Sequence, residues 1–203
     1  MAITAEQVKE LRAETGAGVM DCRKALEKAG GDFKKAIELL REKGLAKAAE
    51  RASREASEGV LELYSNGNGR VGVIVEVNSE TDFVARSAEF RAFANEVALQ
   101  IAAGAPLYVR PDDIPAEVLA DERAKARGRA LEEGKPEAVV DRIVEGRLEK
   151  FIDEACLLRQ PYIRDEDLTV EQLLHQNIAA IGENIVIRRF VRWEVGESTA
   201  PRI

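Results

Sequence analysis

Residues 71–93 read VGVIVEVNSETDFVARSAEFRAF, a strand pattern that passes directly into a helix pattern. Valines at every second position from Val71 to Val77 predict a half-buried strand. Ser87 is a suitable N-cap for a helix whose apolar residues recur at helical spacing: Phe90, Phe93, Ala94, Val97, Ala98 and Ile101. Between strand and helix lies a short segment in which acidic Asp82 adjoins aromatic Phe83. Such a segment can pack locally or project toward a partner.

A β-hairpin is predicted to end in this strand. Residues 60–64 form the first strand, and the Asn-Gly repeat at 66–69 tolerates the positive φ angles of tight hairpin turns. Residues 106–109 predict a further short edge strand. The hairpin and the following helix therefore predict a central domain with a helical layer over a sheet.

Three helices are predicted in residues 1–44. Thr4 and Gln7 form a capping box, and Gly16 offers a stop for the first helix. The second ends at the glycine pair 30–31, and the third begins at Asp32 and stops before Gly44. Their apolar positions fall on one face of each helix, which predicts a compact three-helix module. Residues 45–58 carry many charges and no apolar stripe, which predicts an exposed, partly helical linker.

The rest of the chain predicts a helical hairpin and a final strand. Residues 115–133 form a highly charged helix, residues 134–136 break it, and an amphipathic helix follows, so the hairpin covers about 115–158. Thr169 caps a further helix that ends at Gly182. In the last strand five residues are predicted to face one way: Ile185, Ile187, Val191, Trp193 and Val195. We expect the core to span residues 59–196, and residues 197–203 to form a disordered tail.

Composition narrows the functional class. A net charge of −7 over 203 residues argues against a nucleic-acid binder. The sequence contains no long apolar run and no basic-then-apolar leader, which predicts a cytoplasmic protein without a membrane segment. Cys22 and Cys156 lack metal-ligand spacing and are too few for a disulfide framework, so each is expected to be a buried, reduced thiol.

Residues 67–72 match the G-x-G-x-x-G pattern of dinucleotide-binding folds. That motif functions only when a helix N-terminus follows the glycines and faces the pyrophosphate. Here a strand follows, so the match indicates a hairpin turn. No G-x-x-x-x-G-K-[ST] motif is present either, and we expect the chain itself to bind no nucleotide.

No catalytic constellation is visible. His175 is the only histidine, and its helical neighbours predict a surface residue without a catalytic or zinc-binding partner. Glu80 and Asp82 could act as an acid–base pair, but nothing else in the sequence completes such a site. We therefore expect no catalytic residue, no bound metal and no cofactor, and the chain is not predicted to be an enzyme.

Asp82 and Phe83 also have purely structural interpretations. Asp82 could cap the first turn of a helix, and Phe83 could complete the core beneath the hairpin. The residue pattern leaves these alternatives open beside a role in partner binding. By themselves, the residues indicate an acidic α+β protein of several modules, which fits an interaction protein better than an enzyme.

Two segments resemble signature sequences of the elongation factor Ts family. Residues 11–26 (LRAETGAGVMDCRKAL) are similar to the N-terminal signature, and residues 76–86 (EVNSETDFVAR) to the second one. Residues 144–161 and 181–196 are similar to later parts of the family. Arg23 stands where lysine is common in the family, and it keeps the charge.

The resemblance implies nucleotide exchange on the GTPase elongation factor Tu, in its GDP-bound and nucleotide-free states. It implies that the three-helix module is ubiquitin-associated-like and docks on the GTPase through Leu11, Arg12, Thr15, Gly16, Gly18, Met20 and Asp21. It further implies that Thr81, Asp82, Phe83 and Val84 disturb the partner's Mg²⁺ site. The partner would hold nucleotide and metal, and this chain neither.

Longer family members carry two core subdomains and an inserted coiled coil, whereas this sequence predicts only one sheet-forming hairpin. It therefore resembles the short form of the family, in which a homodimer can supply what one chain lacks. The resemblance thus implies a homodimer. The acidic charge and the lack of a long apolar run further predict that the chain binds neither nucleic acid nor membranes directly.

Two other classes compete with an exchange factor. The N-terminal helices could serve as a general peptide- or ubiquitin-binding module, but this leaves the hairpin and residues 81–84 unexplained. An RNA-binding translation protein is disfavoured by the acidic charge and by the absence of strands that combine aromatic and basic residues.

Overall fold

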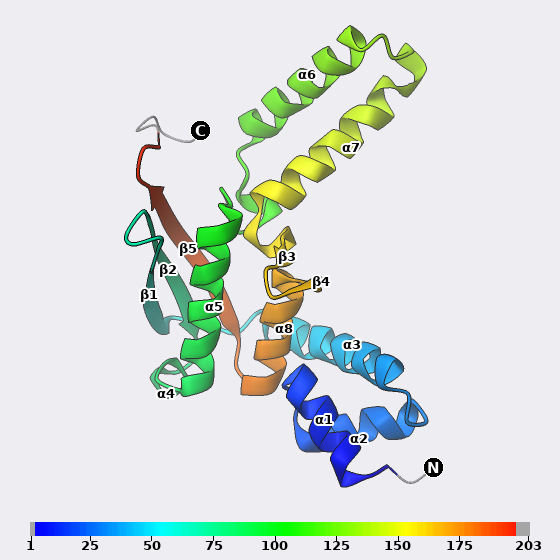
Figure 1. Cartoon of the computed structure of the whole chain (residues 1–203), viewed down its shortest axis with the longest axis vertical. Helices are drawn as coiled ribbons and strands as arrows, with labels where there is room; N and C mark the ends of the chain where they lie inside the picture. Colours follow the sequence, from blue (N-terminus) through cyan, green and yellow to red (C-terminus); the bar gives the residue numbers. More distant parts are fainter. Residues whose placement is uncertain (1–2, 198–203) are drawn as a thin grey trace. The chain divides into compact units, whose positions relative to one another are not determined.

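The computed structural model describes residues 3–197 and has α+β architecture, as predicted. Figure 1 labels its elements. The helices are α1 (Ala5–Thr15), α2 (Val19–Lys28), α3 (Phe33–Arg51), α4 (Asp82–Ala85), α5 (Ala88–Gly104), α6 (Ala116–Glu132), α7 (Glu137–Ala155) and α8 (Val170–Ile181), with 3₁₀ turns η1 (Pro111–Asp113) and η2 (Leu157–Arg159). The strands are β1 (Glu58–Asn66), β2 (Val71–Ser79), β3 (Pro161–Tyr162), β4 (Asp165–Thr169) and β5 (Ile185–Glu194).

Packing divides the described chain into two units that interleave along the sequence. Unit 1 comprises residues 3–62, 75–96 and 171–188. Unit 2 comprises residues 63–74, 97–170 and 189–197. Strands β1, β2 and β5 and helix α5 contribute residues to both units. The division at residues 44 and 58 that the sequence pattern suggested stays a prediction.

The N-terminal helices pack around a small apolar core in unit 1. Thr4 caps α1 as predicted, because its hydroxyl accepts from the Gln7 amide at 3.2 Å and Gln7 Oε1 accepts from the Thr4 amide at 3.0 Å. Gly16 ends α1 with a φ of 65°, a left-handed conformation that glycine adopts without strain. The buried core consists of Val8, Leu11, Cys22, Ala25, Leu26 and Ala36.

Helix α3 is longer than the sequence pattern suggested. We predicted that it stops before Gly44, but it continues to Arg51, so much of the expected linker at 45–58 is helix. Gly44 and Ala48 are buried, and a Cβ atom at Gly44 would lie 3.8 Å from the His175 carbonyl oxygen of α8. Small residues thus form the contact face of this turn. A pattern of large apolar residues does not reveal such a face. The predicted end of α3 before Gly44 was therefore wrong.

The three-stranded sheet has the order β1-β2-β5. A tight turn joins β1 to β2, with φ values of 60° at Gly67, 56° at Asn68 and 86° at Gly69. This confirms that the glycine pattern is a hairpin turn. Ser87 caps the start of α5 by accepting from the Phe90 amide at 3.2 Å. The buried apolar residues of the sheet and of α5 include Val73, Val75, Val77, Phe90, Phe93, Ala94, Val97, Ala98, Ile101, Ile185 and Ile187.

Strand β5 does not keep a single apolar face. Ile185 and Ile187 are buried as predicted, but Val191, Trp193 and the following Val195 are exposed. Arg188 pairs with Glu76 in unit 1, whereas Arg192 in unit 2 donates to the Ala102 carbonyl of α5. Arg188 thus points away from the buried side of the strand, whereas Arg192 points toward α5. The alternation of side chains along β5 therefore changes between these two arginines. The predicted single face was wrong because strict alternation stops inside the strand.

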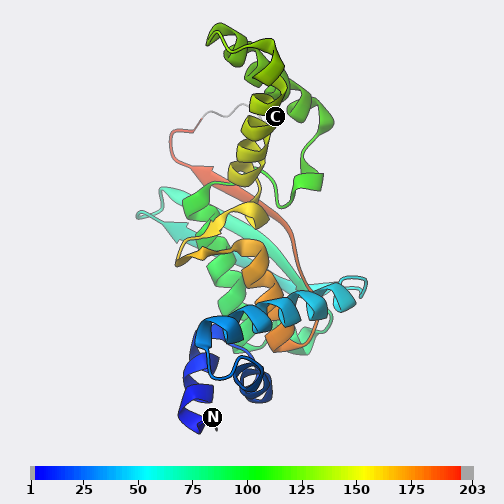
Figure 2. The same cartoon turned by 90° about the vertical axis from the view of Figure 1, so that its right-hand side faces the viewer.

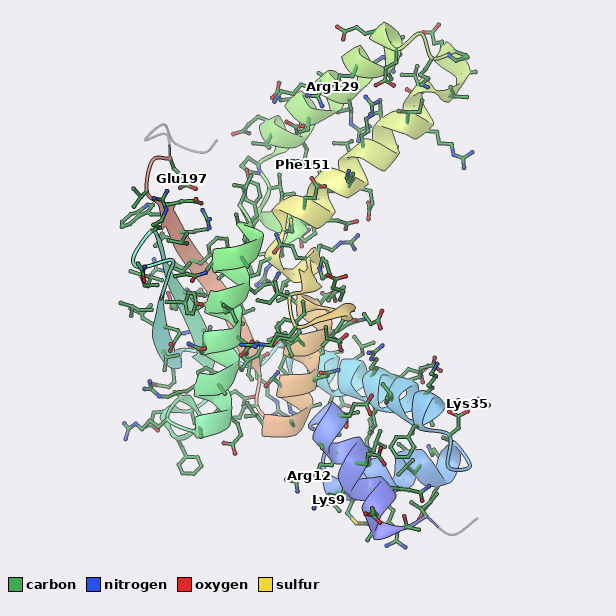
Figure 3. All side chains as sticks on the ribbon, in the orientation of Figure 1. Lys9, Arg12, Lys35, Arg129, Phe151 and Glu197 are labelled. Carbon is green, nitrogen blue, oxygen red and sulfur yellow. The ribbon has the colours of Figure 1, made fainter. Side chains whose placement is uncertain are left out.

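One other predicted feature differs in the structure, and the predicted tail stays a prediction. Residues 106–109 form no edge strand, and only an isolated bridge joins Tyr108 to Cys156. Short strands β3 and β4 pair antiparallel with each other instead. Glu197, predicted to begin the disordered tail, accepts from Arg192 at 2.7 Å; Figure 3 labels it. Residues 198–203, the rest of that tail, lie outside the described residues.

Helices α6 and α7 form the predicted helical hairpin within unit 2, and they run side by side in Figures 1 and 2. Pro136 stands at the N-cap of α7, where its missing N–H costs nothing. Charged pairs such as Arg127–Asp141, at 2.7 Å, join the helices outside their core. That core contains Ala126, Ala130, Val140, Val144 and Leu148.

Both cysteines are buried free thiols, as predicted. Burial is the main cause that raises the pKa of Cys22, and it raises the pKa of Cys156 to about 11. In the part of the chain that the structure describes, every helix is too short or too polar to span a membrane.

Asp21 connects α2 to α3 by two ion pairs. Its carboxylate accepts from Lys43 at 2.7 Å and from Lys47 at 2.9 Å. The hydrogen bond from Lys43, then that from Lys47, lowers the pKa of Asp21 from its ordinary value of 3.8. A lowered folded-state pKa means that the carboxylate stabilises the fold above the unfolded-state pKa, and that this stabilisation is lost as the pH falls through the folded-state value.

Replacing this carboxylate should destabilise unit 1 in a pH-dependent manner. We expect Asp21→Asn to lower the free energy of unfolding by about 1 kcal/mol at pH 7, a typical value for charge-assisted hydrogen bonds at a partly exposed site. The difference from wild type should shrink as the pH falls below the ordinary value of 3.8 and through the lowered folded-state pKa, because the wild-type carboxylate then also becomes protonated. Urea unfolding followed by circular dichroism from pH 7 down to pH 2 measures it.

Glu27→Gln is the matched control, because the Arg23–Glu27 pair is more than half exposed at both side chains and should contribute little. A loss of stability in Asp21→Asn that stays the same from pH 7 down to pH 2 would contradict an electrostatic role for Asp21.

Candidate functional site

The segment between β2 and α5 presents an aromatic side chain to solvent. Phe83 is 81% exposed, which makes it the most exposed of the large apolar side chains in residues 3–197. We call Thr81, Asp82, Phe83 and Val84 the tip segment. Its first three residues are exposed and Val84 is half-buried. The alternative in which Phe83 completes the core beneath the hairpin is therefore wrong.

The tip segment forms a single helical turn. Thr81 is the N-cap of α4, and its hydroxyl accepts from the Val84 amide at 3.3 Å. Asp82, which we considered as a possible cap, is instead the first residue of this helix and pairs with Arg86 at 2.9 Å. Both side chains of that pair are mostly exposed, so water screens it and it is easily exchanged for other contacts.

Glu183, in the loop between α8 and β5, binds the start of the tip segment. One oxygen of its carboxylate accepts from the backbone amides of Glu80 and Thr81 at 3.1 and 3.0 Å. The other oxygen accepts from the Thr81 hydroxyl at 2.7 Å. Sequence reasoning missed Glu183, because no local pattern connects it to a threonine 102 positions earlier.

A second hydrogen bond joins the same two segments, with donor and acceptor exchanged between them. The Glu80 carboxylate accepts from the Asn184 amide at 2.6 Å and pairs with Arg54 at 3.5 Å. Asn184 is buried and donates through its side chain to the Arg54 carbonyl at 2.8 Å. The end of β2, the loop after α8 and the segment after α3 are thus connected within unit 1.

The predicted docking residues of the N-terminal module fall into two groups. Arg12, Gly16, Gly18 and Met20 are exposed, and Figure 3 labels Arg12 and Lys9 on α1. The other three, Leu11, Thr15 and Asp21, serve the module's own structure.

Leu11 is fully buried, the Thr15 hydroxyl donates to the Leu11 carbonyl at 2.7 Å, and Asp21 is paired with two lysines. These three residues can support a docking surface, but Leu11 cannot form part of it. The docking role itself stays a prediction.

The described chain was expected to offer no metal site and to have its single histidine on the surface. Residues 3–197 contain no group of three or more His, Cys, Asp or Glu side chains that could hold a metal ion. His175 is half-buried rather than on the surface as predicted, and its buried Nδ1 has no hydrogen-bond partner. Burial is the main cause that lowers its pKa.

Comparison with known sequences agrees with the resemblance of the two signature segments. The family model described as elongation factor TS matches residues 3–197. Elongation factor Ts of Carboxydothermus hydrogenoformans is 60% identical over 200 residues, which covers 98% of this chain and 92% of the relative. That of Acetivibrio thermocellus is 58% identical over 195 residues, with 96% and 91% covered.

Elongation factor Ts of Caldanaerobacter subterraneus subsp. tengcongensis is 60% identical over 195 residues, which covers 96% of this chain and 98% of the relative. The match extends over nearly the full length of both chains and includes both signature segments. The chain therefore belongs to the elongation factor Ts family of translation factors.

Proposed function

We propose that this protein is a guanine nucleotide exchange factor and not an enzyme. It binds the GDP-bound form of elongation factor Tu, promotes GDP release by disturbing the Mg²⁺ and nucleotide site, and allows GTP to enter. The observation that carries this proposal is Phe83, an 81% exposed aromatic on a turn fixed by hydrogen bonds, in a chain of the elongation factor Ts family. It acts in the cytoplasm and itself holds neither nucleotide nor metal.

The physical task of such a factor is to lower a barrier. A tightly held nucleotide leaves slowly because many contacts to its phosphates and Mg²⁺ break together. Each 1.36 kcal/mol removed from that barrier accelerates release about tenfold. The factor binds the nucleotide-free state of its partner better than the nucleotide-bound state, and by linkage it weakens nucleotide binding by the same factor.

The tip segment supplies the favourable energy in this scheme. Phe83 enters a pocket of the partner, and burying such a side chain contributes about 1.5–3 kcal/mol. Asp82 offers repulsion or competing hydrogen bonds near the metal site, and its exposed pair with Arg86 is easily broken. The N-terminal module docks through the exposed residues Arg12, Gly18 and Met20. Exchange then follows the nucleotide concentrations, since the factor needs no preference for GTP.

We also infer that the protein is a homodimer. Unit 2 exposes apolar side chains on the face of its sheet opposite α5: Leu63 of β1, Ile74 of β2, and Val191 and Trp193 of β5. Trp193 is 73% exposed. Contiguous apolar surface of this kind is typical of a protein–protein interface. A second copy of the chain fits the resemblance to the short form of the family.

Truncating the aromatic ring tests the role of the tip segment. We expect Phe83→Ala to slow the stimulated release of GDP from elongation factor Tu about tenfold or more, since a loss of 1.4 kcal/mol is already tenfold. The thermal unfolding of the variant should match wild type, because the ring is almost fully exposed. Stopped-flow release of a fluorescent GDP measures the rate.

Leu131→Ala, which truncates an exposed apolar residue of α6, is the matched control and should release GDP like wild type. Equal acceleration by Phe83→Ala and wild type would remove Phe83 from the mechanism.

The Mg²⁺ dependence tests the role of Asp82. We expect the defect of Asp82→Ala to be largest at millimolar Mg²⁺ and to disappear when EDTA removes the metal, because Asp82 then has no metal site to disturb. The same release assay over a series of Mg²⁺ concentrations shows this. Asp112→Ala, which removes an exposed carboxylate from η1, controls for the change in net charge. If the slower GDP release of Asp82→Ala were the same at all Mg²⁺ concentrations, this role of Asp82 would be refuted.

The oligomeric state tests the apolar sheet face. We expect wild type to sediment as a dimer at micromolar concentration, and Trp193→Lys to sediment as a monomer because a charge would be buried in the interface. Trp193 is the only tryptophan, so the emission of wild type should shift to the red on dilution. Leu131→Lys should remain dimeric. Monomeric wild type, or dimeric Trp193→Lys, would contradict the interface.

A further inference from the structure

We propose that Glu183 is a positioning residue: its carboxylate holds the tip segment in the conformation that engages the partner. This inference rests on the proposed function, because it assigns a supporting residue to the same site. Glu183 lies between α8 and β5, far in sequence from the tip, and acts on the partner only through Thr81 and the turn that Thr81 caps.

The contact uses both oxygens of the carboxylate. One accepts from two consecutive backbone amides, at Glu80 and Thr81, and the other accepts from the Thr81 hydroxyl. Hydrogen bonds to an ionised acceptor are stronger than neutral ones, and three of them on two adjacent residues fix the backbone as well as one side chain. The last residues before α4 are thereby fixed in position.

The Thr81 hydroxyl transmits this constraint to the helical turn. A hydroxyl has a single proton, and here the proton points to Glu183 at 2.7 Å. Its lone pair is then free to face the Val84 amide, which donates to it at 3.3 Å. Glu183 therefore selects the orientation of Thr81 that caps α4.

Helix α4 needs such support because it has only four residues, Asp82–Ala85. An isolated helical turn is unstable in water, since its nucleation costs more than its few hydrogen bonds return. Apolar packing cannot hold its Phe83 in place, because that ring is almost fully exposed. Only Ala85 of this helix is buried, so hydrogen bonds at the N-cap add support that its small apolar contact does not give.

Glu183 is not placed to stabilise its own helix. It follows α8 by two residues, and the partial negative charge at a helix C-terminus disfavours a carboxylate there. The three donors from Glu80 and Thr81 offset that repulsion. The loop is itself anchored, because the neighbouring Asn184 is buried and bonded to both Glu80 and the Arg54 carbonyl.

The consequence for function is preorganisation. If the partner binds only one conformation of the tip, the apparent affinity falls in proportion to the fraction of molecules that have this conformation. Without the Glu183 contact, Phe83 would still be exposed, but the helical turn of α4 would be formed in only a fraction of the molecules. Exchange activity would fall although no residue that touches the partner had changed.

Glu183→Gln is the sharpest variant, since it keeps the shape of the side chain but removes the charge and one acceptor oxygen. Its NH₂ group either faces the two backbone amides or donates to the Thr81 hydroxyl, which can then no longer donate to residue 183. We expect amide hydrogen exchange at residues 81 and 84 to accelerate about fivefold or more, while the β2 amides at 75 and 77 stay unchanged. Stimulated GDP release should slow about threefold to tenfold.

A double-mutant cycle separates positioning from general damage. If Glu183 acts through the tip, Glu183→Gln should slow release in the wild-type background and have no further effect in the Phe83→Ala background. An equal effect in both backgrounds would overturn the proposal. Glu117→Gln, which removes an exposed carboxylate from the first turn of α6, should leave both hydrogen exchange and release unchanged.

A second variant guards against misfolding. Glu183→Asp keeps the charge but withdraws the carboxylate by one methylene, and it should show the same loosening confined to the tip. Faster hydrogen exchange throughout unit 1 in both variants, or an unchanged tip in both, would overturn the positioning role. If wild type itself fails to accelerate GDP release, the proposed function fails, whereas the hydrogen-exchange result still reports on Glu183 and the tip.

Discussion

A carboxylate after α8 accepts hydrogen bonds from the backbone turn after β2, and that turn leads into the short helix that carries the exposed Phe83. An aromatic side chain normally stays in place because other apolar groups surround it, but those groups would also hide it from a partner. Here Glu183 and the Thr81 hydroxyl fix the turn by polar contacts on one side, which leaves the ring free on the other. Rigidity and exposure are thus obtained together.

The N-terminal module also combines exposed side chains with side chains that stabilise the fold. Its signature segment contains residues that face solvent, such as Arg12 and Met20, and residues that build the module, such as Leu11 and Asp21. Asp21 is engaged by two lysines of α3, so its carboxylate supports the surface formed by its neighbours. The signature segment therefore contains exposed residues next to residues that are buried or ion-paired within the module.

Local features of the fold were predictable where their causes are local. The Thr4–Gln7 capping box, the Ser87 cap, the hairpin turn at 67–69 and the pair α6 and α7 depend on residues a few positions apart. The errors have non-local causes. Helix α3 passes Gly44 because small residues there meet α8, and β5 turns its later apolar residues outward because its alternation breaks between Arg188 and Arg192.

The amino-acid sequence by itself determined the α+β class, the order of the main elements and the resemblance to the elongation factor Ts family, because these depend on local spacing and on two long motifs. It left open whether Phe83 is core or surface, and although Glu183 lies in the family-like segment 181–196, it indicated no contact between Glu183 and Thr81. Only the tertiary structure decided both. Burial depends on which distant segments come to lie against a residue, and the Glu183–Thr81 contact joins positions 102 residues apart that folding brings within 2.7 Å.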